Sequence, residues 1–174
     1  MTQQRTDGAL PADAANSYVE ALRERLAADG CGVTAANWGE HRVAIGSRAD
    51  RKARWFGTRT ELFVFAAAVP RVDDASLAEF TGWSLTYAKS IRSGLPGARN
   101  AVMVLSALVS DDVQPSAREW AAADARMLGT SVVGRPLTIE TAPGAGRVTM
   151  YRGGVAWGGM FTRHVLEKAA LYFP

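Results

Sequence analysis

The sequence predicts an α/β (α+β) fold, in which a single mixed β-sheet of about five to six strands has helices packed on it. Two uniformly apolar stretches, residues 61–69 and residues 101–109, indicate the middle of that sheet. Because both alternating faces of each stretch are apolar, each is typical of a strand covered on both sides. Segments with apolar residues at helical spacing alternate with the strands. The expected order of elements is α-β-β-β-α-β-α-β-β-α.

Length and composition are typical of one domain. The chain has 174 residues, of which 48% are hydrophobic and 21% are charged. Its apolar runs are far shorter than the roughly 20 residues of a membrane-spanning helix, and its first eight residues are polar. We therefore expect no membrane association and a cytoplasmic location. Residues 1–12 are expected to be a flexible tail, and residues 13–174 a single globular domain.

Residues that carry chemistry are few. Cys31 is the only cysteine, so neither an internal disulfide nor a cysteine-based zinc site can form. His41 and His164 are the two histidines, too few for a multi-histidine metal site. Signatures for phosphate loops, dinucleotide binding and serine nucleophiles are absent. The sequence therefore predicts no catalytic residue, no metal and no cofactor.

Local signals in the N-terminal half predict a helix, a hairpin and a second helix. Ser17 and Glu20 have capping-box spacing, which predicts a helix that begins there. Residues 33–38 and 41–46 are expected to form two short strands around a tight turn. After the central strand, the acidic pair before residue 75 provides N-capping oxygens for a long helix over about residues 74–93.

The C-terminal half is expected to contain two further helices and a hairpin. Pro115 suits the first turn of a helix that ends at Gly129, with Leu128 on its inner face. Strand residues follow at 132–133 and 137–140, and the alternation of residues 147–152 is typical of a sheet edge. A final helix over about residues 160–172 ends the order.

One stretch is strongly basic and is a candidate nucleic-acid site. The net charge is only +3, but basic residues outnumber acids six to one between Arg42 and Arg59. Trp55 and Phe56 lie within the stretch and could stack on bases. The alternative is a twisted hairpin with solvated charges. The candidate phosphate-binding residues are Arg48, Arg51, Lys52, Arg54 and Arg59.

The C-terminal helix is a candidate interface. It is apolar to its end, and the hairpin 136–152 before it has an alternating edge strand able to pair. These features predict a protein partner or a homodimer. The interface residues expected on the helix are Phe161, Val165, Tyr172 and Phe173.

The order of the first six elements, over about residues 17–109, resembles the core of the PD-(D/E)xK nucleases. That resemblance implies acids near the second and third strands, for which Asp50 and Glu61 are the candidates. It also implies a lysine two positions after Glu61, where this chain has Phe63; Lys89 could replace it only if its helix turns it inward. The pattern therefore implies a fold with degenerate catalytic residues.

These observations together predict a non-catalytic, self-associating protein-interaction domain. A nucleic-acid-binding domain that uses residues 48–59 is the alternative, and a degenerate nuclease fold is a further one.

Overall fold

A computed structural model of the chain describes residues 11–93, 100–142, 146–155 and 159–174. In these residues one mixed sheet of seven strands has the order β1-β2-β3-β4-β6-β5, with β7 also paired to β6. The predicted fold class is confirmed. The strands are β1 (Gly32–Trp38), β2 (His41–Arg51), β3 (Arg59–Ala68), β4 (Asn100–Ser110), β5 (Arg126–Leu128), β6 (Val132–Glu140) and β7 (Arg147–Met150). The helices are α1 (Pro11–Ala28), α2 (Asp74–Ile91), α3 (Pro115–Ala123) and α4 (Thr162–Tyr172), with short 3-10 turns at Ala53–Trp55 and Gly159–Phe161.

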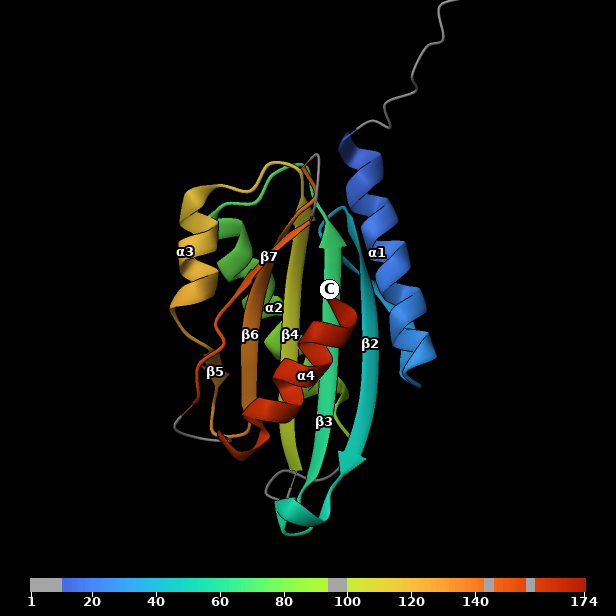
Figure 1. Cartoon of the computed structure of the whole chain (residues 1–174), viewed down its shortest axis with the longest axis vertical. Coiled ribbons are helices and arrows are strands. Elements are labelled where there is room, and N and C mark those ends of the chain that lie inside the picture. The colour runs from blue at the N-terminus through green and yellow to red at the C-terminus, as the bar shows by residue number, and fades with distance from the viewer. Residues whose placement is uncertain (1–10, 94–99, 143–145, 156–158) are drawn as a thin grey trace, which may run out of the picture.

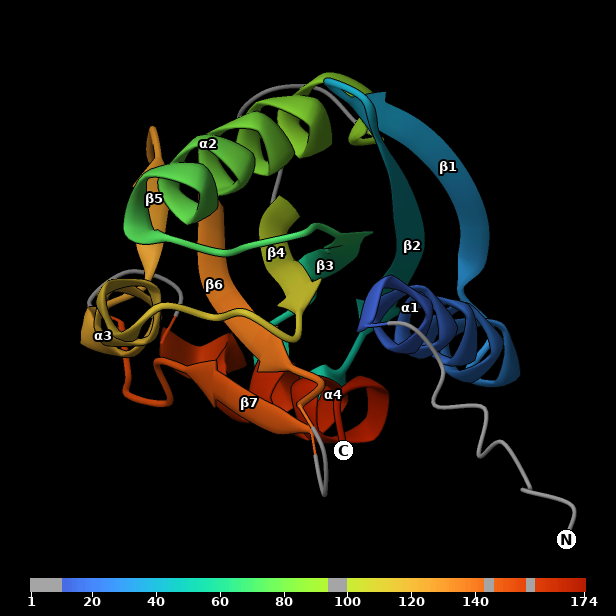
Figure 2. The ribbon, with the colours of Figure 1, turned by 90° about the horizontal axis from the view of Figure 1, so that it is seen from above.

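The two apolar stretches form the centre of the sheet, as the sequence predicts. β3 and β4 are parallel neighbours, and α2 is the crossover between them. β4 and β6 are also parallel, whereas β1, β2 and β3 form an antiparallel meander. The views along and across the sheet show α2 on one face and α4 on the other (Figures 1 and 2).

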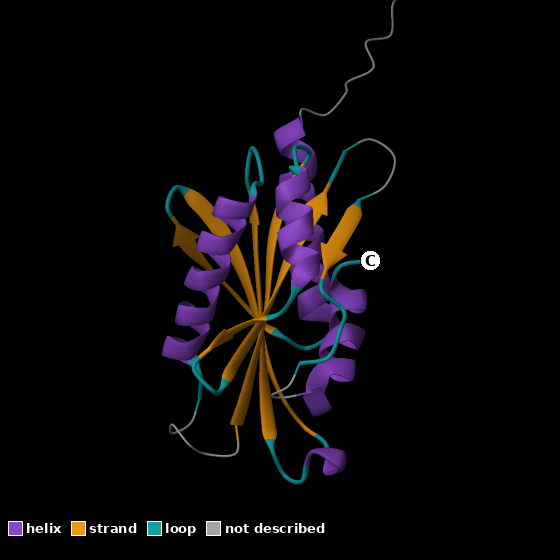
Figure 3. Ribbon diagram, turned by 90° about the vertical axis from the view of Figure 1, so that its left-hand side faces the viewer, coloured by secondary structure: helices purple, strands orange, loops and turns teal. Residues whose placement is uncertain are grey.

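Each face of the sheet has its own hydrophobic core. Odd-numbered residues of β3, such as Phe63 and Phe65, pack under α2 and α3. Even-numbered residues, such as Leu62 and Val64, pack under α1 and α4. This alternation of Cβ directions places the helices in layers on both sides of the strands (Figure 3).

The first helix begins earlier than the capping pattern predicts. α1 starts at Pro11, so Ser17 lies inside the helix and does not cap it. The alanine-rich segment before Ser17 has high helix propensity, and Ala15 is buried in the core beneath α1. Of the expected tail, residues 1–10 lie outside the described residues, and the last two residues belong to α1.

The helix that begins at Pro115 is shorter than predicted. It ends at Ala123, where Asp124 is extended and its side chain accepts a hydrogen bond from the Ala125 N–H at 2.7 Å. The next residues form β5, whose backbone pairs with β6 and not with the preceding helical turn. Gly129, with a φ of 62°, serves the turn between these two strands. Leu128 therefore reaches the core from a strand.

β6 is one continuous strand that contains Pro136. Residues 132–134 of β6 pair with β5, and residues 137–140 pair with β7. Pro136 lies in the gap between these two partners, where a missing N–H costs least. In the expected edge hairpin 136–152, β7 is an edge strand. β6 is not, because it also pairs with β4 on its other side.

Candidate functional site

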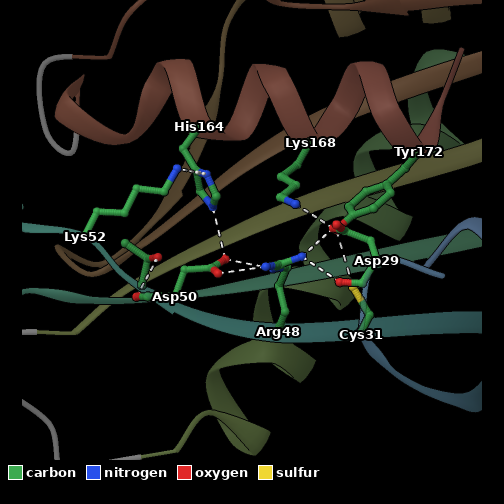
Figure 4. Close-up of polar contacts among 9 residues, drawn as sticks. Asp29, Cys31, Arg48, Asp50, Lys52, His164, Lys168 and Tyr172 are labelled. Atoms are coloured by element: carbon green, nitrogen blue, oxygen red, sulfur yellow. Dashed lines mark hydrogen bonds and ion pairs between the residues drawn. The ribbon is translucent and has the colours of Figure 1, made fainter. Parts of the chain in front are cut away.

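A cluster of polar side chains lies between α4, the start of β1 and the second half of β2, and we call it the polar cluster (Figure 4). Its members come from segments more than 100 residues apart in the sequence. They are Asp29, Cys31, Arg48, Asp50, Lys52, His164, Lys168 and Tyr172. Even-numbered residues of β2 point to the α4 face, which is why Arg48, Asp50 and their neighbours face this helix.

Arg48 is held between two carboxylates. Its Nε and Nη2 donate to the two oxygens of Asp50 at 2.7 and 2.8 Å, and its Nη1 donates to the carboxylate and the backbone carbonyl of Asp29. The hydrogen bond to Asp50 raises the pKa of Arg48 further, and the same contact lowers the pKa of Asp50. The guanidinium therefore carries a permanent charge that is already neutralised inside the chain.

Asp29 joins the end of α1 to α4. Partial burial opposes its ionisation, but hydrogen bonds from Lys168, Tyr172 and Arg48 outweigh that effect and hold its pKa at about 2. The Lys168 ammonium lies 2.6 Å from the carboxylate. The Tyr172 hydroxyl donates to the same oxygen, and burial together with this bond raises the pKa of Tyr172. The Cys31 thiol is 3.4 Å from that hydroxyl.

His164 is buried at the other end of the polar cluster. Its Nε2 lies 3.2 Å from Asp50 Oδ2, and its Nδ1 lies 3.3 Å from Lys52 Nζ. Burial and the Lys52 charge lower its pKa, against the opposing effect of Asp50. The neutral ring therefore donates from Nε2 to Asp50 and accepts at Nδ1 from Lys52, which fixes its tautomer.

The side chains of the polar cluster form their hydrogen bonds and ion pairs mainly with one another. Arg48, Asp29 and Asp50 bind each other and α4, so they act as a fastening between the helix and the sheet. Among the described residues, no group of three or more His, Cys, Asp or Glu side chains is arranged to hold a metal ion. The two carboxylates bind Arg48, Lys168 and His164, and these contacts hold α4 on the sheet.

The predicted nucleic-acid residues do not all lie together. Arg48 belongs to the polar cluster, and Lys52 bonds His164 from the edge of it. The other three, Arg51, Arg54 and Arg59, lie at or beside the turn between β2 and β3, residues 52–58, which we call the β2–β3 turn. These three make no ion pair with any carboxylate in the described part of the chain.

The two aromatic residues of the β2–β3 turn have opposite environments. Trp55 is 1% exposed and packs edge-on against Phe161 and His164, with ring centroids 5.3 and 5.1 Å apart. Phe56 is 79% exposed and has a left-handed backbone, with φ 51° and ψ 38°. Trp55 therefore anchors the turn to α4 and is unavailable for base stacking, whereas Phe56 projects into solvent.

The four residues expected at an interface are all buried within their own chain. Phe161, Val165, Tyr172 and Phe173 belong to the core between α4, α1 and the sheet. The apolar character of the C-terminal segment is thus satisfied by intramolecular packing.

The two acids suggested by the nuclease resemblance lie on opposite faces of the sheet. Asp50 hydrogen-bonds His164 of α4, whereas Glu61 accepts bonds from the backbone N–H and hydroxyl of Ser93, just after α2, at 3.0 and 2.7 Å. Lys89 is exposed on α2. Carboxylates on opposite faces of the sheet are not placed to share one metal ion.

Arg135 is a buried cation that the sequence analysis misses. It is 2% exposed, and it donates to the carbonyls of Tyr151 and Gly153, both at 2.8 Å. Burial lowers its pKa. It lines a cavity of about 20 Å³ beside α4, which is room for about one water molecule. Arg135 therefore fastens the segment after β7 to the sheet.

Comparisons with known proteins add no assignment. No protein-family model matches the chain, and searches of the curated proteins and of the solved structures found no significant match. None of the described helices combines the length and the hydropathy needed to cross a bilayer.

Proposed function

We propose that this chain is a non-catalytic interaction domain that pairs with a second copy of itself through the edge strand β1. The observation that carries the proposal is a free strand edge without the usual protection against pairing. We favour binding over catalysis because the ionisable side chains of the polar cluster are hydrogen-bonded to one another and do not face a substrate site.

β1 offers seven residues for pairing. It forms a regular antiparallel ladder with β2 from Gly32 to Trp38, and no strand of the described chain pairs with its other side. Its sequence, Gly-Val-Thr-Ala-Ala-Asn-Trp, contains no charged residue and no proline. Charges, prolines and bulges are the common devices that keep exposed edges apart.

The opposite edge of the sheet is protected. There the outer strands are β5, with three residues, and β7, with four, and both begin with an arginine. Short strands and charged residues discourage pairing between edges. The contrast makes β1 the better surface, in place of the hairpin 136–152 that the sequence suggests.

The turn geometry identifies which groups of β1 are free. Gly39 and Glu40 separate the strands, and Gly39 has the positive φ of 58° that a two-residue hairpin needs. The pair that closes such a turn is hydrogen-bonded, and the pattern then alternates along the ladder. Val33, Ala35 and Asn37 therefore direct their N–H and C=O groups away from β2.

An antiparallel, two-fold pairing of two β1 strands fits this pattern. Ala35 is the middle residue of the strand and is exposed, so in a symmetric pairing it lies opposite its own copy. The exposed residues of the strand are small or uncharged, and no side chain opposes the approach.

A charge exchange at Ala35 tests the proposal. We expect the unaltered protein to be a dimer by size-exclusion chromatography with light scattering at micromolar concentration. Ala35→Lys and Ala35→Glu should each be monomeric, because like charges directly opposite destabilise a strand pair. An equimolar mixture of the two variants should form a heterodimer.

The matched control is Ala122→Lys, which adds the same charge at an exposed position of α3. It should leave the dimer intact. A monomeric unaltered protein would refute the proposal, and so would a dimer that persists in both Ala35 variants.

A further inference from the structure

We propose that the end of the sheet at the β2–β3 turn is a binding site for single-stranded nucleic acid. Arg51 and Arg59 would hold phosphates there, and Phe56 would stack on a base. This site is separate from the β1 edge and does not depend on self-association.

A pair of arginines without a neutralising partner lies at this end of the sheet. Arg51 and Arg59 are directly opposite each other in the register of β2 and β3, so both side chains leave the same face of the sheet. Like charges in that position repel. Neither arginine has an ion-pair partner in the described residues, and Glu61, the acid on that face of β3, is bound by Ser93. A bound anion would remove the repulsion.

Two further cations lie on the other side of the turn. Lys52 Nζ and the Arg54 guanidinium are 5.3 and 5.9 Å from the centroid of the Trp55 ring. Trp55 packs on α4, on the face opposite to Arg51 and Arg59. Cations thus lie on both faces of the sheet at the turn that carries Phe56, as a nucleic-acid backbone passing over the turn would require.

Phe56 has an unusual backbone conformation. A left-handed backbone is rare for a bulky residue, and where it occurs at an exposed position it is a pointer to function. Hydrogen bonds from Phe56 N to Ala53 O at 3.1 Å and from Thr58 N to Trp55 O at 2.9 Å hold this conformation. The buried neighbour Trp55 fixes the base of the turn. The backbone of the turn thus directs the phenyl ring into solvent.

These features favour a single strand over a duplex or a membrane. Unpaired bases offer a free face for stacking on an aromatic ring, whereas the bases of a duplex are already stacked on each other. Insertion into a bilayer surface depends on buried apolar area. On the β2–β3 turn, Phe56 is the one large apolar side chain that is exposed.

Fluorescence anisotropy with a labelled oligothymidylate, at several salt concentrations, tests the site. The variant Phe56→Asn keeps a residue that tolerates the left-handed backbone and removes the ring. We expect it to bind about 5- to 100-fold more weakly, with an unchanged salt dependence. The double variant Arg51→Ala, Arg59→Ala should reduce the slope of log K against log salt by about 1.4, which corresponds to two phosphate contacts.

Arg42→Ala is the matched control, because it removes an exposed arginine from the same strand, about 30 Å from Arg51. It should change neither the affinity nor the slope. Equal affinity for a duplex of matched length, an unchanged affinity in Phe56→Asn, or binding to phosphatidylserine vesicles without binding to the oligonucleotide would each overturn the proposal.

Discussion

Phe56 is, among the described residues, the non-glycine residue with a positive φ. A left-handed conformation costs an L-residue roughly 1–2 kcal/mol, and the exposed ring recovers little of this by packing. The next residue, Gly57, also has a positive φ, of 79°, so the turn itself requires this shape. The position is therefore occupied by a residue that the local backbone disfavours.

Relief of that strain gives a prediction for stability. We expect Phe56→Gly to raise the free energy of unfolding by about 1 kcal/mol, because glycine adopts this conformation without a steric penalty. Urea denaturation followed by circular dichroism measures the change. Phe56→Val is the contrasting variant and should lower the free energy of unfolding, since a β-branched residue is the least tolerant of positive φ. A stability loss in Phe56→Gly would show that the ring contributes packing.

His164 gives a second prediction at this scale. Its folded pKa is lowered below the value of about 6.5 for free imidazole, so between those two pH values the unfolded chain binds more protons. This part of the stability is complete above about pH 6.5 and is lost as the pH falls through the folded pKa. Asp50, Lys52 and Lys168 are the charged groups that face the ring.

Urea unfolding at neutral pH and at about pH 5 tests the role of His164. His164→Gln should show a smaller loss of stability between these two conditions, because the amide can still donate to Asp50 but does not titrate. The unaltered protein, measured under the same two conditions, is the reference. An unchanged loss in His164→Gln would contradict the prediction.

At the scale of elements, small residues in the strands set how closely the helices approach. A Cβ added to Gly46 of β2 would lie 2.8 Å from both terminal methyl groups of Leu26, a fully buried residue of α1. A Cβ added to Gly134 of β6 would lie 2.6 Å from one terminal methyl group of Leu85 of α2. The glycines thus allow one helix on each face to lie directly on the sheet.

The substitution Gly46→Ala tests how closely α1 lies on the sheet. We expect Gly46→Ala to lower the free energy of unfolding by about 1–3 kcal/mol, because α1 must shift or Leu26 must leave its rotamer. Leu26→Ala alone should cost about 2–5 kcal/mol through the cavity it leaves. In the double variant the new methyl group partly fills that cavity, so the combined loss should be clearly smaller than the sum. Additive losses would argue against direct contact.

For the molecule as a whole, sequence patterns identified the layers but not the polar cluster. Uniform apolarity at residues 61–69 and helical periodicity at Leu77 and Phe80 are local signals, and the structure confirms the strand and the helix that they predict. Arg126–Leu128 was predicted as helix, because its pairing with β6 is not encoded in its own periodicity. The pairing with β6 in the folded chain determines that this segment is a strand.

The polar cluster could not be predicted for a related reason. Asp29 and Lys168 lie 139 positions apart, and Asp50 and His164 lie 114 apart. No spacing rule connects residues at such separations. The apolar C-terminal segment was recognised, but burial against α1 and burial against a partner produce the same apolar pattern.

The separation of the two cores along the chain has a consequence for synthesis on the ribosome. The core beneath α2 and α3 draws on residues no later than Val132, whereas the core beneath α1 needs Phe161, Val165 and Tyr172. When residues up to about 140 have emerged from the ribosome and the later ones have not, one face of the sheet can already be closed, whereas the other is covered by α1 alone. A nascent chain at that stage exposes the part of the sheet that α4 covers in the finished fold, which is the kind of apolar surface that molecular chaperones bind.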